Sequence, residues 1–159
     1  MDLLTVELRS KNMSRIPSKD TSIEIKVIRY LFSNGYRFRK NVRELPGKPD
    51  IVLPKYNTVI FIHGCFWHRH KGCKDATTPK SNVAFWNNKF DANVRNDERH
   101  KEALTQIGWN VIEIWQCEIE KRFDETMISV IESLNEGLTR KNNTKIKREK
   151  TQNDNEALK

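Results

Sequence analysis

The sequence predicts a single α/β domain in which helices flank one mixed sheet. Two observations carry this prediction. Short β-branched apolar runs fall in the middle of the chain, and longer stretches with apolar residues at helical spacing lie on both sides of them. A chain of 159 residues suffices for one domain with a substantial core. We divide it into an N-terminal arm or helix (1–19), a central domain (20–136) and a basic, disordered tail (137–159).

The central domain is expected to begin with a helix. Thr21 and Glu24 have the spacing of a capping box, and Gly35 suits the C-terminal end of that helix. The remaining elements are expected to be strands at 36–39, 50–53 and 58–62, a long helix at 81–107, a strand at 109–115 and an amphipathic helix at 123–136. The strands at 50–53 and 58–62 are close enough along the chain to form a hairpin.

The net charge of +8 indicates a polyanionic partner and favours contact with phosphates. Residues 138–159 hold seven Lys and Arg against three Asp and Glu, so a basic tail on an ordinary enzyme is the alternative explanation. No apolar run approaches the roughly 20 residues of a membrane span, and the acidic start lacks the pattern of a signal peptide. We therefore expect a cytoplasmic protein that binds no membrane.

Residues 59–73 hold three of the four histidines and two of the three cysteines. Cys65, His70 and Cys73 share one loop, and Cys117 follows a strand that can lie beside the predicted hairpin. Three thiolates and one imidazole form a closed tetrahedral zinc site, which would stabilise the loop without doing chemistry. The spacing favours this site over the alternative of three free thiols and a surface histidine.

A second set of polar residues can meet at the end of the hairpin. Pairing of the two strands sets Asp50 near Ile62 and His63, and His68 follows shortly after. A carboxylate and a backbone carbonyl can hold Mg²⁺, and a histidine can move a proton during phosphodiester hydrolysis. The pattern indicates nuclease chemistry. Each histidine alone is more often an ordinary polar residue, and Glu24 is explained as readily by the helix cap.

Aromatic residues accompany this polar cluster. Phe66 and Trp67 lie in the polar loop, and Trp86 lies near the start of the following helix. They either cap the sheet edge or form a wedge that inserts between base pairs. The N-terminal segment around Met13 is basic and polar, which suits both a flexible terminus and an arm that orders on DNA.

The run FIHGCFWHRH at 61–70 is specific, and together with other segments it resembles the very-short-patch-repair (Vsr) mismatch endonucleases of bacteria. The other matching segments are 9–13, 20–24, 45–50, 85–86, 93–97, 108–109 and 115–117. The resemblance implies a single domain with a fold like that of the PD-(D/E)xK restriction endonucleases and a structural zinc site. It also implies a Mg²⁺-dependent endonuclease that nicks one strand 5′ of the T in a T:G mismatch. Such mismatches arise when 5-methylcytosine deaminates, and the nick starts very-short-patch repair.

The resemblance assigns a role to each candidate residue. Asp50 and the carbonyl of Ile62 would hold Mg²⁺. His68 would be general acid or base, oriented by Glu24, and His63 would position water or phosphate. The structural zinc ligands would be Cys65, His70, Cys73 and Cys117. The DNA contacts would be intercalation by Phe66, Trp67 and Trp86, an approach to the other groove by Met13 and recognition of the wobble pair by Lys89.

Two other functions are open from the sequence: a restriction-like or mobile-element endonuclease that cuts paired duplex, and a catalytically inactive zinc-stabilised DNA-binding module. Residues 61–63 stand where restriction enzymes have acid-x-lysine, which argues against the first. The presence of Glu24, Asp50, His63 and His68 argues against the second. We expect duplex DNA with a T:G mismatch as partner, a functional link to a cytosine-5 DNA methyltransferase and to mismatch-repair proteins, and a monomer.

Overall fold

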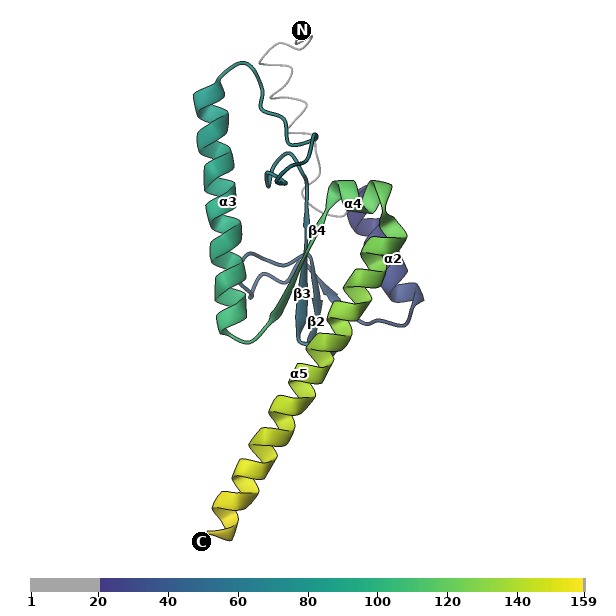
Figure 1. The fold of residues 1–159 in the computed structure, drawn as a ribbon, viewed down its shortest axis with the longest axis vertical. Helices are drawn as coiled ribbons and strands as arrows, with labels where there is room; N and C mark the ends of the chain where they lie inside the picture. Colours follow the sequence, from purple (N-terminus) through teal and green to yellow (C-terminus); the bar gives the residue numbers. More distant parts are fainter. Residues whose placement is uncertain (1–20, 159) are drawn as a thin grey trace.

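The computed structural model describes residues 21–158 and is organised around one four-stranded sheet (Figure 1). The strands are β1 (Arg39–Lys40), β2 (Ile51–Leu53), β3 (Thr58–His63) and β4 (Asn110–Trp115), and this is also their order in the sheet. The first three strands pair antiparallel, whereas β3 and β4 pair parallel. The predicted mixed sheet is therefore confirmed.

Helices cover both faces of this sheet. They are α2 (Ser22–Ser33), α3 (Val83–Gln106), α4 (Gln116–Lys121) and α5 (Phe123–Ala157), and a 3₁₀ turn, η1 (Pro54–Tyr56), lies in the hairpin. Figure 1 shows α3 on one side of the sheet and α2, α4 and α5 on the other. Thr21 begins α2 as predicted, because its hydroxyl accepts a hydrogen bond from the Glu24 backbone N–H at 3.4 Å.

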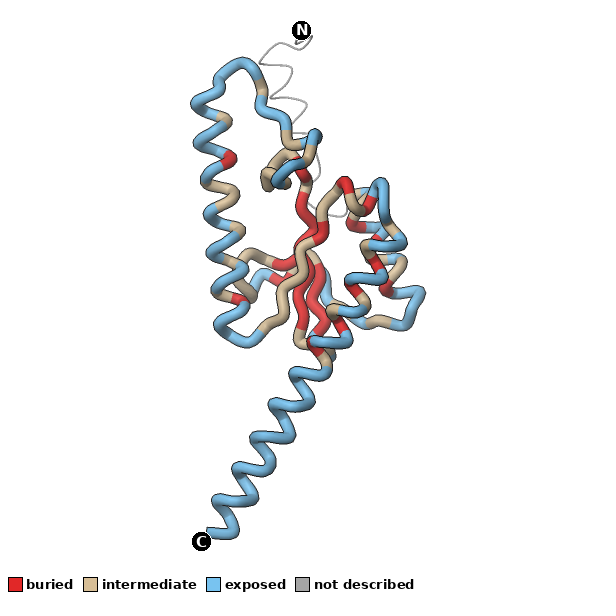
Figure 2. The backbone as a smooth tube through the Cα atoms, viewed as in Figure 1, coloured by how far each residue is buried: buried red, intermediate tan, exposed pale blue. Residues whose placement is uncertain are grey.

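The core lies on the two faces of β2 and β3, where every residue is buried (Figure 2). Alternate side chains point to opposite faces of a strand, so Ile60 and Ile62 face one side while Val59 and Phe61 face the other. The Ile60 and Ile62 side packs against α2, α4 and α5, and the Val59 and Phe61 side packs against Leu104 of α3. Burial on both faces explains why these strands are continuously apolar.

Strand register brings together the segments that carry the candidate site. In the hairpin, Ile51 pairs with Ile60, so Asp50 lies one step beyond, beside the end of β3. In the parallel pair, His63 lies opposite Trp115, and Cys117 follows at the start of α4. Both placements were expected from the sequence and are confirmed.

Helix α5 departs from the sequence prediction. The predicted helix ended near residue 136 and was followed by a disordered tail, but α5 continues to Ala157, so the expectation of disorder is wrong. Gly137 does not end the helix. It is needed for close packing, because a Cβ there would clash with the carbonyl oxygen of Tyr56. No proline or further glycine follows in residues 138–157, so nothing in the sequence stops the helix.

Three smaller points complete the fold. The short helix α4 was not predicted, and the first strand is only Arg39–Lys40 rather than 36–39. The expected N-terminal arm (1–19), including Met13, lies outside the described residues. Within residues 21–158, no helix combines the length and the apolar character that crossing a bilayer requires.

Candidate active site and metal centre

A pocket of about 200 Å³ lies where β3 ends. Its lining includes the four predicted catalytic residues Glu24, Asp50, His63 and His68, which come from α2, the start of β2, the end of β3 and the loop after it. Ile62 also lines it. Residues spread over 45 positions of sequence are thus collected at one end of the sheet. The hairpin prediction accounts for Asp50 and His63, and Glu24 is added by the position of α2.

Asp50 is the half-buried acid of this pocket. Its Oδ2 accepts a hydrogen bond from the backbone N–H of Ile62 at 2.7 Å. The pKa of Asp50 is raised from 3.8 to about 6, chiefly by burial. The nearby charge of Glu24 also raises it, while the Ile62 N–H and His68 act in the opposite direction. A cation would relieve the cost of ionising two neighbouring carboxyls, so the pair suits a hard metal ion.

The loop before Asp50 is fixed by contact with α3. Gly47 has φ +74, and a Cβ at this position would lie 2.8 Å from the Cβ of His100. Both the backbone conformation and the space therefore require glycine here. His100, which the sequence did not single out, lines the same pocket and forms the surface on which this loop rests.

Two histidines and an aspartate lie together in the pocket. The rings of His63 and His68 are 4.2 Å apart, and the Nδ1 atom of His68 lies 2.6 Å from Oδ2 of Asp97. The three side chains place one ligand atom each within 4.8 Å of one another. Burial, and secondarily the charge of His68, lowers the pKa of His63 to about 4, so His63 is neutral at pH 7.

The contact between His68 and Asp97 adds a residue to the predicted set. The structure has Asp97 as a carboxylate on the His68 Nδ1 atom, and the orienting role that the resemblance implied for Glu24 stays a prediction. With the Nδ1 proton held by this carboxylate, Nε2 becomes the atom that can accept or donate a proton. The arrangement therefore suits general acid–base chemistry at His68.

Asp97 lies in the matching segment 93–97, but no role was assigned to it from the sequence because it is one polar residue in a polar helix. The available signal was helical spacing from a buried anchor, Phe90, to residues three and seven positions later. Asn93 and Asp97 both face the histidine loop, and Asn93 donates a hydrogen bond to the Trp67 carbonyl at 3.0 Å. One face of α3 thus holds the loop at two points.

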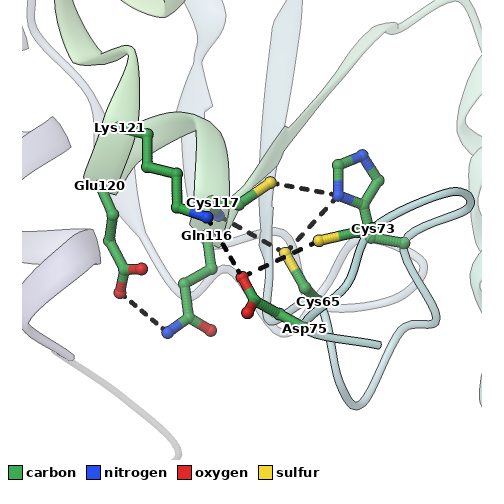
Figure 3. A network of polar contacts seen from close by, with 8 residues as sticks. Cys65, Cys73, Asp75, Gln116, Cys117, Glu120 and Lys121 are labelled. Atoms are coloured by element: carbon green, nitrogen blue, oxygen red, sulfur yellow. Dashed lines mark hydrogen bonds and ion pairs between the residues drawn. The ribbon is translucent and has the colours of Figure 1, made fainter. Parts of the chain in front are cut away.

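The four predicted zinc ligands also meet. The Cys65, Cys73 and Cys117 sulfur atoms lie together in Figure 3, two from the loop and one from α4. With His70 they place all four ligand atoms within 4.8 Å of one another. The His70 Nδ1 atom lies 3.6 Å from the Cys65 sulfur and 3.3 Å from the Cys117 sulfur. Ligand atoms around a tetrahedral zinc lie roughly 3.5 Å apart, so this set fits the ion.

The electrostatics of the cluster agree with that fit. Burial raises the pKa values of the Cys65 and Cys117 thiols, and the neighbouring cysteines raise the pKa of Cys65 further. Two such thiols would become thiolates only beside a positive charge. His70 stacks on Trp115 with ring centroids 4.3 Å apart, which fixes the orientation of its ring.

The predicted aromatic wedge is a packed cluster beside the pocket. Phe66 contacts Trp67 at 5.1 Å and Trp86 at 6.0 Å between ring centroids, and buried Phe90 lies 5.1 Å from Phe66. Phe66, Trp67 and Trp86 are half-buried, so each still presents a surface to solvent. The structure thus joins the three residues, although they are up to 20 positions apart. Lys89 is exposed on α3, one turn after Trp86.

Comparison with known proteins gives a consistent result. The family model for the DNA mismatch endonuclease Vsr matches residues 1–75. The chain is 46% identical over 121 residues to the type II nicking enzyme V.NmeAIP of Neisseria meningitidis, which covers 76% of this chain and 86% of the relative. It is 40% identical over 127 residues to the DNA mismatch endonuclease Vsr of Escherichia coli, covering 78% of this chain and 81% of that protein.

A third relative extends the pattern. The type II nicking enzyme V.XorIIP of Xanthomonas oryzae is 46% identical over 118 residues, covering 74% of this chain and 86% of the relative. Identity at this level over most of both chains, together with the site geometry, decides the classification. The chain belongs to the Vsr endonuclease family.

Proposed function

We propose that this protein is a Mg²⁺-dependent endonuclease that nicks one DNA strand 5′ of the T in a T:G mismatch and so starts very-short-patch repair. The observation that carries the proposal is the single pocket that collects Glu24, Asp50, His63 and His68 beside an aromatic cluster. The Escherichia coli relative is named a DNA mismatch endonuclease, and the two other relatives are named nicking enzymes. Both names describe cleavage of DNA, which is the chemistry that the residues of the pocket suit.

The reaction would be hydrolysis of one phosphodiester. A water oxygen forms a bond to phosphorus while a bridging P–O bond breaks, and the leaving oxygen takes up a proton. His68, oriented by Asp97 at 2.6 Å, is placed to move one of these protons. His63 is neutral at pH 7 and can hold the water or a phosphate oxygen by a hydrogen bond.

Two metal ions complete the proposal. Asp50, with the carbonyl of Ile62, would hold Mg²⁺, which would offset charge on the phosphate oxygens and favour ionisation of the water. The geometric support is that Ile62 and Asp50 are already joined by a hydrogen bond. Cys65, His70, Cys73 and Cys117 would hold a structural zinc, for which their spacing is suitable.

The aromatic cluster is the proposed mismatch reader. Phe66, Trp67 and Trp86 would insert beside the mismatch from the major groove. Such insertion unstacks and kinks the duplex, and it costs least at a mispaired step. The exposed Lys89 would contact the wobble pair, and Met13 would approach from the opposite groove. The hydrogen bond from Asn93 to the Trp67 carbonyl supports this role, because a wedge needs a rigid base.

Several wider properties follow from the same proposal. The four-stranded mixed sheet with its active site at one end agrees with a restriction-endonuclease-like fold. The protein would act as a monomer on cytoplasmic DNA, since nicking one strand needs one site. A cytosine-5 DNA methyltransferase would create its substrate indirectly, and mismatch-repair proteins would be functional partners.

A panel of end-labelled duplexes tests the proposed function. Each duplex carries one T:G pair in a different methylation-site context, and a fully paired duplex of identical sequence accompanies it. The expected result is one nick, 5′ of the T, in Mg²⁺, with none in the paired duplex. Asp50→Ala serves as the inactive control. Efficient cutting of paired DNA would instead identify a restriction-like enzyme, and binding without any nick would identify an inactive module.

A further inference from the structure

A positively charged groove lies at the opposite end of the sheet from the candidate active site. A groove of about 1050 Å³ runs between the distal half of α5 and the turn that joins α3 to β4. Five cationic side chains line it, namely Lys55, Arg140, Lys141, Lys145 and Arg148. Among the described residues that line this groove, none is acidic.

The chemistry of the groove suits a phosphodiester backbone. Besides the cations, the lining offers neutral hydrogen-bond donors, including Asn57, Asn142 and Thr144. Lysine, arginine, amide and hydroxyl groups are the side chains that contact phosphates without reading sequence. Arg140 to Arg148 span about 12 Å of α-helix, and a DNA duplex presents roughly seven phosphates over that length. The number of cations in the groove is therefore comparable with the number of phosphates along the same length of duplex.

The groove has a fixed wall. The Lys141 ammonium donates a hydrogen bond to the Pro54 carbonyl at 2.7 Å, and Gly137 lies against Tyr56 so closely that a Cβ would clash. Asn110 also donates to the Ser133 carbonyl at 3.3 Å. These contacts hold α5 against the hairpin, so its orientation is set before any ligand binds.

Beyond this anchor, α5 is not buried against any other part of the described structure. Residues 139–158 are all exposed, and Figure 2 shows this half of the helix extending away from the sheet. A helical segment of this length is marginal in water without a partner. Two of the groove cations have exposed carboxylate neighbours, Arg140 with Glu136 at 3.6 Å and Lys145 with Glu149 at 4.0 Å. Such exposed pairs are weak and exchange readily for phosphate.

The groove is separate from the catalytic pocket. The pocket lies at the His63 end of β3, whereas the groove lies at the Thr58 end, where η1 and Asn110 are located. A strand of six residues is about 20 Å long, so the two sites are roughly one duplex diameter apart. A ligand in the groove would therefore contact DNA that lies outside the nicked step.

We propose that this groove is a second, non-catalytic DNA-binding site that holds the phosphodiester backbone of duplex flanking the cleavage site. It would contribute sequence-independent affinity and keep the enzyme on DNA between mismatches. The inference relies on DNA being the partner, as the proposed function holds, but it does not depend on T:G specificity.

Two double variants on the same helix test the inference. The first is Lys145→Gln with Arg148→Gln, which removes two charges from the groove. The matched control is Lys147→Gln with Lys150→Gln, which removes two charges from residues of α5 outside the groove lining. Glutamine is a good helix former, so circular dichroism should show equal helix content in both.

The readout is the affinity for a fully paired duplex of about 40 base pairs, measured by fluorescence anisotropy over a range of salt concentrations. The groove variant should lose at least about tenfold in affinity near 0.1 M salt, and its log–log salt slope should fall by about 1.8. The control variant should change by less than half as much. Equal losses in the two variants, or no loss in either, would overturn the inference.

A second measurement separates this inference from the proposed function. Nicking of a T:G duplex of about 12 base pairs at saturating enzyme should be the same for both variants and the unmodified protein. A slower rate in the groove variant alone would contradict a non-catalytic role. If the unmodified protein nicks no T:G duplex, the proposed function fails. The comparison of salt slopes would then still show whether the groove binds DNA.

Discussion

One loop supplies histidines to two clusters of opposite character. His70 joins three cysteines, two of them buried, in a set that fits a closed zinc site. His68, two residues earlier, joins His63, Asp97 and the half-buried Asp50 in a pocket open enough to hold about 200 Å³. The Trp115 ring lies between the two sets, 4.3 Å from His70 and 5.1 Å from His63 between centroids.

The ligand chemistry of each cluster indicates whether a bound metal would have a structural or a catalytic role. Thiolates and imidazole favour zinc and fill all four of its positions, which leaves none for a substrate. Carboxylate and carbonyl oxygens favour Mg²⁺, which retains water and accepts phosphate oxygens. Loss of a ligand from the first cluster should therefore destabilise the fold, whereas loss of a ligand from the second should lower activity without destabilising the fold.

The largest effect is expected from Asp50→Asn in the pocket. Loss of the carboxylate removes the proposed Mg²⁺ ligand, so single-turnover nicking of T:G duplex should fall by about 10³-fold or more. Binding of the same duplex, measured without Mg²⁺, should change little. Asp91→Asn, at an exposed position of α3 outside the pocket lining, is the matched control and should nick normally. A variant at position 50 that nicks within tenfold of the unmodified rate would refute the assignment.

The corresponding change in the sulfur cluster is Cys117→Ser. This variant should lose bound zinc and about 4 kcal/mol of stability, which lowers the melting temperature by roughly 10 °C. Zinc content by mass spectrometry and melting by circular dichroism check both effects. Removal of zinc from the unmodified protein by a chelator should reproduce the shift. An unchanged melting temperature in a variant that has lost its zinc would contradict a structural role for the metal.

A smaller and opposite stability effect is expected at Asp50. Its folded-state pKa of about 6 exceeds the ordinary 3.8, so its contribution to stability is full below pH 3.8 and is lost as pH rises through 6. Neutral Asn keeps that contribution at every pH. In Mg²⁺-free buffer, Asp50→Asn should therefore be more stable than the unmodified protein by about 2 kcal/mol at pH 7.5. Urea unfolding at pH 4 should show the difference nearly gone, and an equal difference at both pH values would contradict it.

The smallest effect on activity is expected from Asp97→Asn, because Asp97 acts through His68. Loss of its charge should slow nicking by about ten- to a hundredfold, comparable with other residues that orient a histidine. Affinity for the T:G duplex should stay unchanged, since Asp97 acts on the chemical step by orienting His68. Asp91→Asn lies on the same helix and is exposed, so it should leave rate and affinity unchanged. A rate loss accompanied by loss of affinity and of thermal stability would indicate a merely structural role.

Much of this comparison was accessible from the sequence, for identifiable reasons. Apolar runs and turn residues set the hairpin register, and register alone places Asp50 beside Ile62. The chain has only three cysteines, and His70 lies between two of them in the loop, which leaves few choices for a zinc site. The link between His68 and Asp97 was not accessible, because it depends on where α3 lies against the loop. Gly137 was misread because only tertiary packing distinguishes a glycine needed for close contact from one that ends a helix.

The most direct test measures nicking and zinc content together in the unmodified protein and Asp50→Asn. The substrate is an end-labelled T:G duplex in Mg²⁺, with the fully paired duplex beside it. We expect a single nick 5′ of the T for the unmodified protein only, with equal zinc content in both proteins. A nick of equal rate in the Asp50→Asn protein, or loss of its zinc together with its activity, would contradict the separation of the two clusters.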